Sequence, residues 1–254
     1  PEAIQKYNVQ GRVEQLAVQA LPKESAQAAA GHAVGTPGLR GATVDFDLNE
    51  SSGKATVLVQ EGAVDLPGVF EEPVVPITRL SADLAWQRNG EKLAVQVPQM
   101  RFANADAEGE LQLKWHTSDP ERSGARSRYP GVLDMQGKLS RGTGTRVYRY
   151  LPLVLHKNVR DYVRDAVQGG SSPSVVFKVR GDLSDMPFVN PKQGEFSIVA
   201  SIRDGVLAYV PRSHQSADAL PWPVLTQLSG DLIFERQSLQ VRGARGALQA
   251  QPAV

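Results

Sequence analysis

The sequence predicts a mainly β protein, built as an antiparallel, meandering sheet with one polar face. Three observations predict it: apolar and polar residues alternate along many short runs, Gly, Pro, Asn and Asp separate these runs, and one hairpin pattern occurs twice. Alternation of this period places apolar side chains on one face of a strand and polar side chains on the other. Antiparallel sheets commonly keep one face in water. The clearest runs are residues 44–48, 55–59, 93–97, 175–179, 196–202 and 239–241.

The hairpin pattern is LSADLAWQRNGEKLAVQV at 80–97 and LSGDLIFERQSLQV at 228–241. The first nine positions share Leu, Ser, Asp, Leu and Arg, with an aromatic residue seventh (Trp86 and Phe234). A strand, a glycine, a short strand and a proline-containing loop precede each copy. This order indicates a tandem β unit of about 50–60 residues, which buries its apolar face on its neighbours. The alternative is a coincidence between two hairpins.

A fainter third copy opens the chain, in residues 7–46. Its apolar phase slips by one residue, which indicates either a bulge or a false match.

One segment breaks the β pattern, with apolar residues at helical spacing that include Leu155, Val159 and Val163. We expect a helix over 153–167, with these three side chains against a sheet. Pro152 is tolerated because it falls near the first turn, and a glycine pair follows the last turn. Five basic residues accompany only two acidic ones in this segment, so the alternative is an amphipathic helix that contacts lipid headgroups.

The pattern divides the chain into four parts. Residues 1–115 are a first β block with two tandem units, and 116–145 are a polar loop with a connecting strand. Residues 146–170 contain the helix, and 171–254 are a second β block with a further repeat unit. The chain begins at Pro1 without a methionine, so we interpret it as a segment of a longer protein.

Composition excludes several classes of function. The net charge is +1 over 254 residues, which predicts no nucleic-acid partner. There is no cysteine, and no apolar run approaches the roughly 20 residues of a membrane span. None of the four histidines has ligand spacing, and no nucleophile or phosphate-loop motif occurs. We therefore expect no enzyme activity, no catalytic residue, no cofactor and no metal.

Several features together resemble the periplasmic AsmA-like proteins of the YhdP type, a family of bridge-like lipid transporters. The resemblance covers most of residues 37–248 and keeps the order of the features. They are LSADLAWQRNGEKLAVQ at 80–96, RFANADA at 101–107, YLP at 150–152 before RDYVRDAV at 160–167, VRGDLSDMPF at 179–188 before GEF at 194–196, and WP at 222–223.

The resemblance implies an elongated, curled antiparallel sheet, groove-like and built of repeated β units, with one amphipathic helix around 150–168. It also implies a periplasmic segment of a protein anchored in the inner membrane of Gram-negative bacteria. Such proteins carry phospholipid toward the outer membrane, so the expected partners are phospholipid acyl chains and envelope proteins. The family offers no catalytic residues to carry over.

The alternation selects one set of side chains as candidates to line the apolar groove. The other function considered is a non-catalytic structural or protein-interaction β module, whose apolar faces close on each other. The candidate lining residues are Val57, Val59, Leu84, Trp86, Leu93, Val95, Val97, Phe196, Ile198, Ile202, Leu232, Phe234, Leu239 and Val241.

Overall fold

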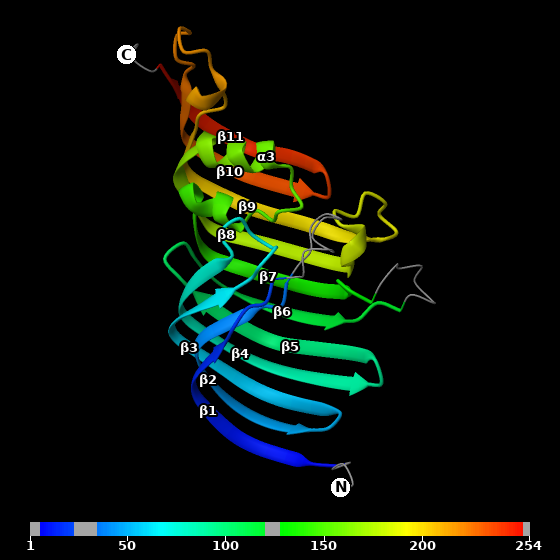
Figure 1. Cartoon of the computed structure of the whole chain (residues 1–254). Coiled ribbons are helices and arrows are strands. Elements are labelled where there is room, and N and C mark those ends of the chain that lie inside the picture. The colour runs from blue at the N-terminus through cyan, green and yellow to red at the C-terminus, as the bar shows by residue number, and fades with distance from the viewer. Residues whose placement is uncertain (1–5, 23–34, 120–127, 251–254) are drawn as a thin grey trace.

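In the computed structural model, residues 6–22, 35–119 and 128–250 are described. Eleven strands form a single sheet in which every strand pairs antiparallel with its neighbours in the sequence (Figure 1). The predicted mainly β, antiparallel meander is confirmed. The strands are β1 Asn8–Val18, β2 Gly38–Asn49, β3 Ser52–Asp65, β4 Val74–Asn89, β5 Lys92–Ala103, β6 Ala107–His116, β7 Val132–Thr143, β8 Val167–Asp182, β9 Gly194–Leu207, β10 Val224–Glu235 and β11 Ser238–Gln249.

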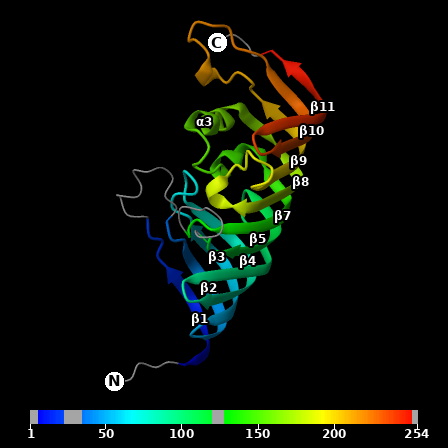
Figure 2. The ribbon, with the colours of Figure 1, turned by 90° about the vertical axis from the view of Figure 1, so that its right-hand side faces the viewer.

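The sheet is elongated and curled, and the two termini lie at opposite ends of it (Figures 1 and 2). Neighbouring strands lie about 4.8 Å apart, so eleven strands extend over about 48 Å. β6 and β7 pair across the boundary predicted between the two β blocks, and both blocks therefore belong to one continuous sheet. The division of the sequence into blocks stays a prediction.

The two sides of the sheet at which the strands end, here called its edges, carry different connections. Because the strands follow one another as a meander, successive connections alternate between the edges. One edge, here called the hairpin edge, carries tight turns such as 90–91 and 236–237. The other, the loop edge, carries longer segments at 66–73, 144–166 and 208–223.

Strands bend at residues with a left-handed backbone. Gln15, Glu61, Asp204 and Gln227 have φ between 52° and 54°, a region that costs an L-residue other than glycine roughly 1–2 kcal/mol. The register shifts beside Gln15, between Val13 and Leu16 of β1. The slip of apolar phase in the faint third copy is therefore a bulge, which turns the following side chains back to the same face.

Both copies of the repeated sequence form antiparallel hairpins. In the first, Asn89 opposes Lys92 across a two-residue turn. In the second, Glu235 opposes Ser238 in the same way, two residues earlier in the pattern. Neither segment is helical, as the repeat interpretation requires.

The helical segment differs from the prediction in extent and in packing. The α-helix α3 spans Lys157–Ala166, whereas 144–150 form the 3-10 helix η1 (Gly144–Tyr150) and β8 begins at Val167. The helix predicted over 153–167 is therefore four residues too long at its start and one residue too long at its end. Two further single-turn 3-10 helices are η2 (Leu183–Asp185) and η3 (Arg212–His214).

The expected packing of Leu155 and Val159 on the sheet is wrong. Their exposed fractions are 36% and 48%, while Arg160 and Ala166 are buried. The physical reason is that α3 docks on loops. The Arg160 guanidinium donates to the Leu155 carbonyl at 3.3 Å, and the Tyr162 hydroxyl donates to the Tyr209 carbonyl at 3.1 Å.

A polar cluster holds η1 against the loop edge. The buried carboxylate of Asp106 accepts hydrogen bonds from Arg149 Nη1 at 2.7 Å and from the Tyr150 hydroxyl at 3.0 Å. Asn104 donates to the same hydroxyl at 2.9 Å, and Arg149 Nε donates to Glu72 at 2.8 Å. Burial, with the neighbouring Asp106 charge, raises the pKa of Tyr150 above its ordinary value. The cluster therefore joins three successive loops of this edge.

Candidate functional site: the concave apolar face

The two faces of the sheet differ in polarity and in burial. In β3, Val57 and Val59 are 9% and 1% exposed, while Leu58 between them is 41% exposed. Side chains converge on the inside of a curled sheet and diverge on its outside. The face of Val57 and Val59 is therefore the concave face, and the sheet curves around it (Figure 2).

A complete row of opposed residues crosses the concave face from β1 to β11. Each member faces the next directly across the strand pairing, so their side chains lie on one face. Every member is apolar or glycine. This central row consists of Val13, Val44, Val57, Ala82, Met100, Leu111, Gly137, Phe177, Ile198, Phe234 and Leu239.

A second complete row runs beside it on the side of the loop edge. It too has one residue from each of the eleven strands, and none is polar. The loop-side row consists of Leu16, Ala42, Val59, Leu80, Phe102, Gly109, Leu139, Val175, Ala200, Leu232 and Val241. Two uninterrupted rows make the apolar surface continuous over the whole width of the sheet.

Toward the hairpin edge, two further rows cover part of the sheet. The hairpin-side row runs from β5 to β9, and the outer row runs from β1 to β9. The hairpin-side row is Val97, Leu113, Met135, Val179 and Phe196. The outer row is Val9, Leu48, Gly53, Trp86, Val95, Trp115, Leu133, Gly181 and Gly194.

Glycines in these rows make room for rings on the neighbouring strand. A Cβ at Gly53 would overlap the indole of Trp86, and one at Gly137 would overlap the ring of Phe177. At Gly181 and Gly194 the ring is that of Phe188, which is fully buried in the loop after β8. Rings beside these glycines keep the concave surface apolar where a side chain is missing.

The opposite face is charged. Exposed ion pairs join neighbouring strands there, among them Lys178 with Glu195 at 2.7 Å and Arg101 with Glu110 at 3.7 Å. Such pairs contribute little to stability, on the order of 0–1 kcal/mol each. Asp45 and Asp47 also lie on this face, where Arg12 and Gln10 contact them.

All fourteen candidate lining residues lie on the concave face by register and alternation. Most are members of the rows above. Leu84 opposes Ala55, Leu93 opposes Arg88, and Ile202 opposes Gly230, each in phase with a row member of its own strand. Their role in contacting a ligand stays a prediction.

Sequence reasoning missed the middle of the same surface. Leu111 and Leu113 alternate with polar residues in GELQLKW, and Leu133 and Met135 do so in LDMQGKL. The same period-two signal could have found both segments. Gly137 breaks the apolar pattern of β7, and only the ring of Phe177 on β8 shows why.

The concave face is open at both ends of the sheet. Val9 and Val13 of β1 are 44% and 38% exposed, and Phe234, Leu239 and Val241 are 39%, 55% and 55% exposed. No second sheet covers the face within the described ranges. Large exposed apolar surfaces of this kind mark sites of interaction.

The described part of the chain contains no group of three or more potential metal ligands. His32 lies outside it, and His116 and His214 contact carbonyl or hydroxyl oxygens beside them in the sequence. None of the helices in the described part has the length and hydropathy to cross a membrane.

These features define a class of protein: an open, curled antiparallel sheet whose concave face is continuously apolar across its strands. The chain belongs to the YhdP family, whose profile, described as YhdP protein, matches residues 1–253. Searches of the curated proteins and of the solved structures found no match. Membership of this family indicates a role related to lipid transport in the cell envelope.

Proposed function

We propose that the concave face binds the acyl chains of phospholipids and forms one stretch of a path along which they move. On this proposal the chain is a periplasmic part of an inner-membrane-anchored protein that carries phospholipid toward the outer membrane. The protein has no enzyme activity in this role and needs no cofactor.

One observation supports this proposal above the others: the central and loop-side rows are apolar on all eleven strands. Each buried methylene contributes about 0.8 kcal/mol, so about 15 methylenes of one acyl chain contribute roughly 12 kcal/mol before ordering costs. One leaflet of a bilayer core is about 15 Å thick, so a groove of about 48 Å exceeds the length of an extended chain. A lipid can therefore shift along the rows and exchange one apolar contact for another.

The alternative module with a closed core requires a second apolar layer against the concave face. The described residues form no second sheet, and Phe188 of the loop after β8 covers Gly181 and Gly194. The open concave face therefore favours lipid binding over the module with a closed core.

Substitutions at two residues of similar exposure test the proposal. Phe234 on the concave face is 39% exposed and Leu58 on the convex face is 41% exposed. A carboxylate at either position reaches water, so Phe234→Asp and Leu58→Asp are both expected to fold. The purified proteins are then analysed by mass spectrometry for co-purifying phospholipid, and a photo-crosslinker at Val241 measures lipid contact.

We expect bound phospholipid in the unaltered protein and in Leu58→Asp, and a severalfold loss in Phe234→Asp. Absence of lipid from the unaltered protein, or equal loss in both variants, contradicts a groove on the concave face.

A further inference from the structure

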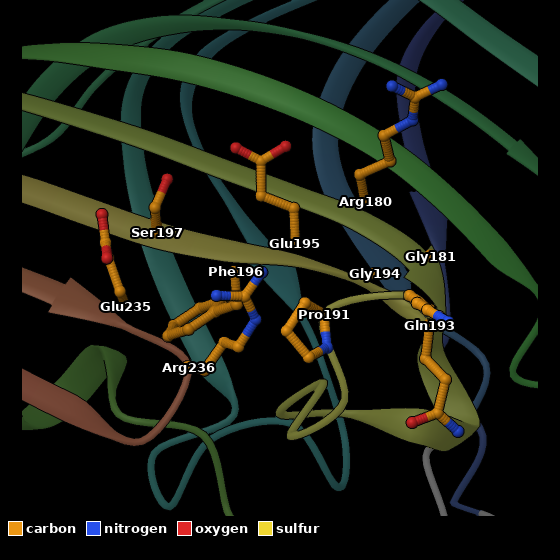
Figure 3. A pocket seen from close by; sticks show the side chains of 11 residues that line it. Arg180, Gly181, Pro191, Gln193, Gly194, Glu195, Phe196, Ser197, Glu235 and Arg236 are labelled. Carbon is orange, nitrogen blue, oxygen red and sulfur yellow. The ribbon is translucent and has the colours of Figure 1, made fainter.

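The apolar hairpin-side row ends in an arginine. Phe196 closes the row on β9, and the next position across the sheet is Arg236, whose backbone N–H donates to the Phe196 carbonyl at 3.0 Å. Arg236 begins the turn after β10 with a left-handed backbone, and its side chain lies on the same side of the strands as the ring of Phe196 (Figure 3). A cation therefore follows a row in which each strand from β5 to β9 places an apolar side chain.

Arg236 lines a pocket of 510 Å³ at the hairpin edge, between the loop after β8 and the turn after β10 (Figure 3). Figure 3 shows Arg180, Glu195, Ser197 and Glu235 pointing to one side of the strands, and Phe196, Pro191 and Arg236 on the other. Both acidic residues of the lining thus lie on the convex side. Among the described residues that line the pocket, none on the side of Arg236 carries a negative charge.

One donor of the guanidinium is also unsatisfied. Arg236 Nε is shielded from solvent and has no hydrogen-bond partner among the described residues. A buried donor without a partner costs about 1–3 kcal/mol, more for a charged group, so this geometry favours a ligand that supplies an acceptor. Arginine is suited to phosphate because its planar fork of N–H groups matches the oxygens of a phosphate group.

The sequence repeat provides a comparison. The arginine of the first copy, Arg88, also lies beside its hairpin turn, but its Nε donates to the Gly90 carbonyl at 3.1 Å. That arginine is satisfied within its own turn and is exposed. The two arginines hold the same position in the sequence pattern, but only Arg88 has an acceptor for its Nε within the described residues.

We infer that the pocket at Arg236 binds the phosphate group of a phospholipid whose acyl chains lie along the neighbouring apolar rows. This deepens the proposed function, on which it rests, by assigning the headgroup a fixed place at the hairpin edge. Phe196 belongs to both the pocket and the hairpin-side row, so one amphiphile can contact the cation and the groove at once.

The test compares two fluorescent lipids with identical chains, phosphatidylglycerol and the uncharged diacylglycerol, binding to the full chain. A charge-assisted hydrogen bond predicts roughly tenfold tighter binding of the phosphate-bearing lipid. Arg236→Gln removes this preference and leaves diacylglycerol binding unchanged, whereas Arg88→Gln, the matched control, keeps the preference. Arg236→Lys, which retains the charge without the fork, keeps part of it and serves if the glutamine variant folds poorly.

Inorganic phosphate identifies the source of the ligand. If phosphate alone at millimolar concentration removes the preference, the site is one for free phosphate and the headgroup assignment fails. An unchanged preference in Arg236→Gln, or equal losses in both glutamine variants, overturns the inference while leaving the groove intact. Failure of the unaltered protein to bind diacylglycerol as well contradicts the proposed function itself.

Discussion

The indole of Trp86 on β4 lies over Gly53 on β3, its direct partner across the strand pairing. The ring occupies the space that a Cβ at position 53 would need. Gly53→Ala therefore displaces the ring, and we expect a loss of about 1–3 kcal/mol in the free energy of unfolding. Urea unfolding measures this loss.

Gly142→Ala is the control for this substitution. Its backbone lies outside the left-handed region, and the nearest atom to an added Cβ is Ser172 Cβ at 3.8 Å. We expect its stability to change by less than about 0.5 kcal/mol. Equal effects of the two variants would contradict the role assigned to the Trp86 ring.

A second prediction concerns the tightest part of the concave face. Val59 is 1% exposed and packs in a cluster with Ala42, Val57 and Ile77. Val59→Ala removes two buried methyl groups and leaves a cavity, so we expect a loss of about 2 kcal/mol in unfolding free energy. Val199→Ala on the convex face, at 39% exposure, should cost less than about 1 kcal/mol in the same urea titration. A reversed order would contradict the assignment of faces.

The fold and the faces of the strands follow from local patterns in the sequence. Period-two alternation predicts Val57, Ile198 and Phe234 on one side because a strand has no other way to place them. Curling does not follow from alternation, since it accumulates over eleven strands and their bulges. The residue types of Glu61 and Asp204 do not predict a left-handed backbone, although each residue precedes a glycine.

The candidate site could be predicted only as a set of side chains. Register decides which residue of one strand meets which of the next, and it depends on bulges that the sequence leaves open. Arg236 shares the LSxDL pattern with Arg88, but only the position of Phe196 beside it reveals the pocket. The packing of the helix was predicted wrongly for a related reason: apolar spacing finds an amphipathic face, while hydrogen bonds to loops decide how α3 docks.

A third prediction tests the corrected packing of α3. Val159 is 48% exposed, so Val159→Asp should change the melting temperature by no more than about 2 °C. Ala166 is fully buried, and its carbonyl accepts from the Ala208 N–H at 2.8 Å. Ala166→Asp buries a charge there and should cost several kcal/mol. A large loss for Val159→Asp would restore the packing expected from the sequence, and a small one leaves its exposed face available to lipid headgroups.

The last prediction is a pH dependence at the hairpin edge. Burial opposes ionisation of Asp182, but hydrogen bonds from Ser118 Oγ at 2.6 Å and from Ser184 at 2.6 and 3.0 Å stabilise the carboxylate and hold its pKa below the ordinary value. A depressed pKa in the folded state contributes stability above the unfolded pKa of about 3.9, and the contribution is lost as the pH falls through the folded value.

Asp182→Asn should therefore lower the unfolding free energy at pH 7 by about 0.5–1 kcal/mol, a modest figure because the carboxylate is partly exposed. Between pH 5 and pH 2 the two proteins should converge, since the native aspartate loses its advantage as it is protonated. Urea unfolding at each pH measures the difference. A difference for Asp182→Asn that stays constant down to pH 2 would show that packing, not the charge held by Ser118 and Ser184, fixes this loop.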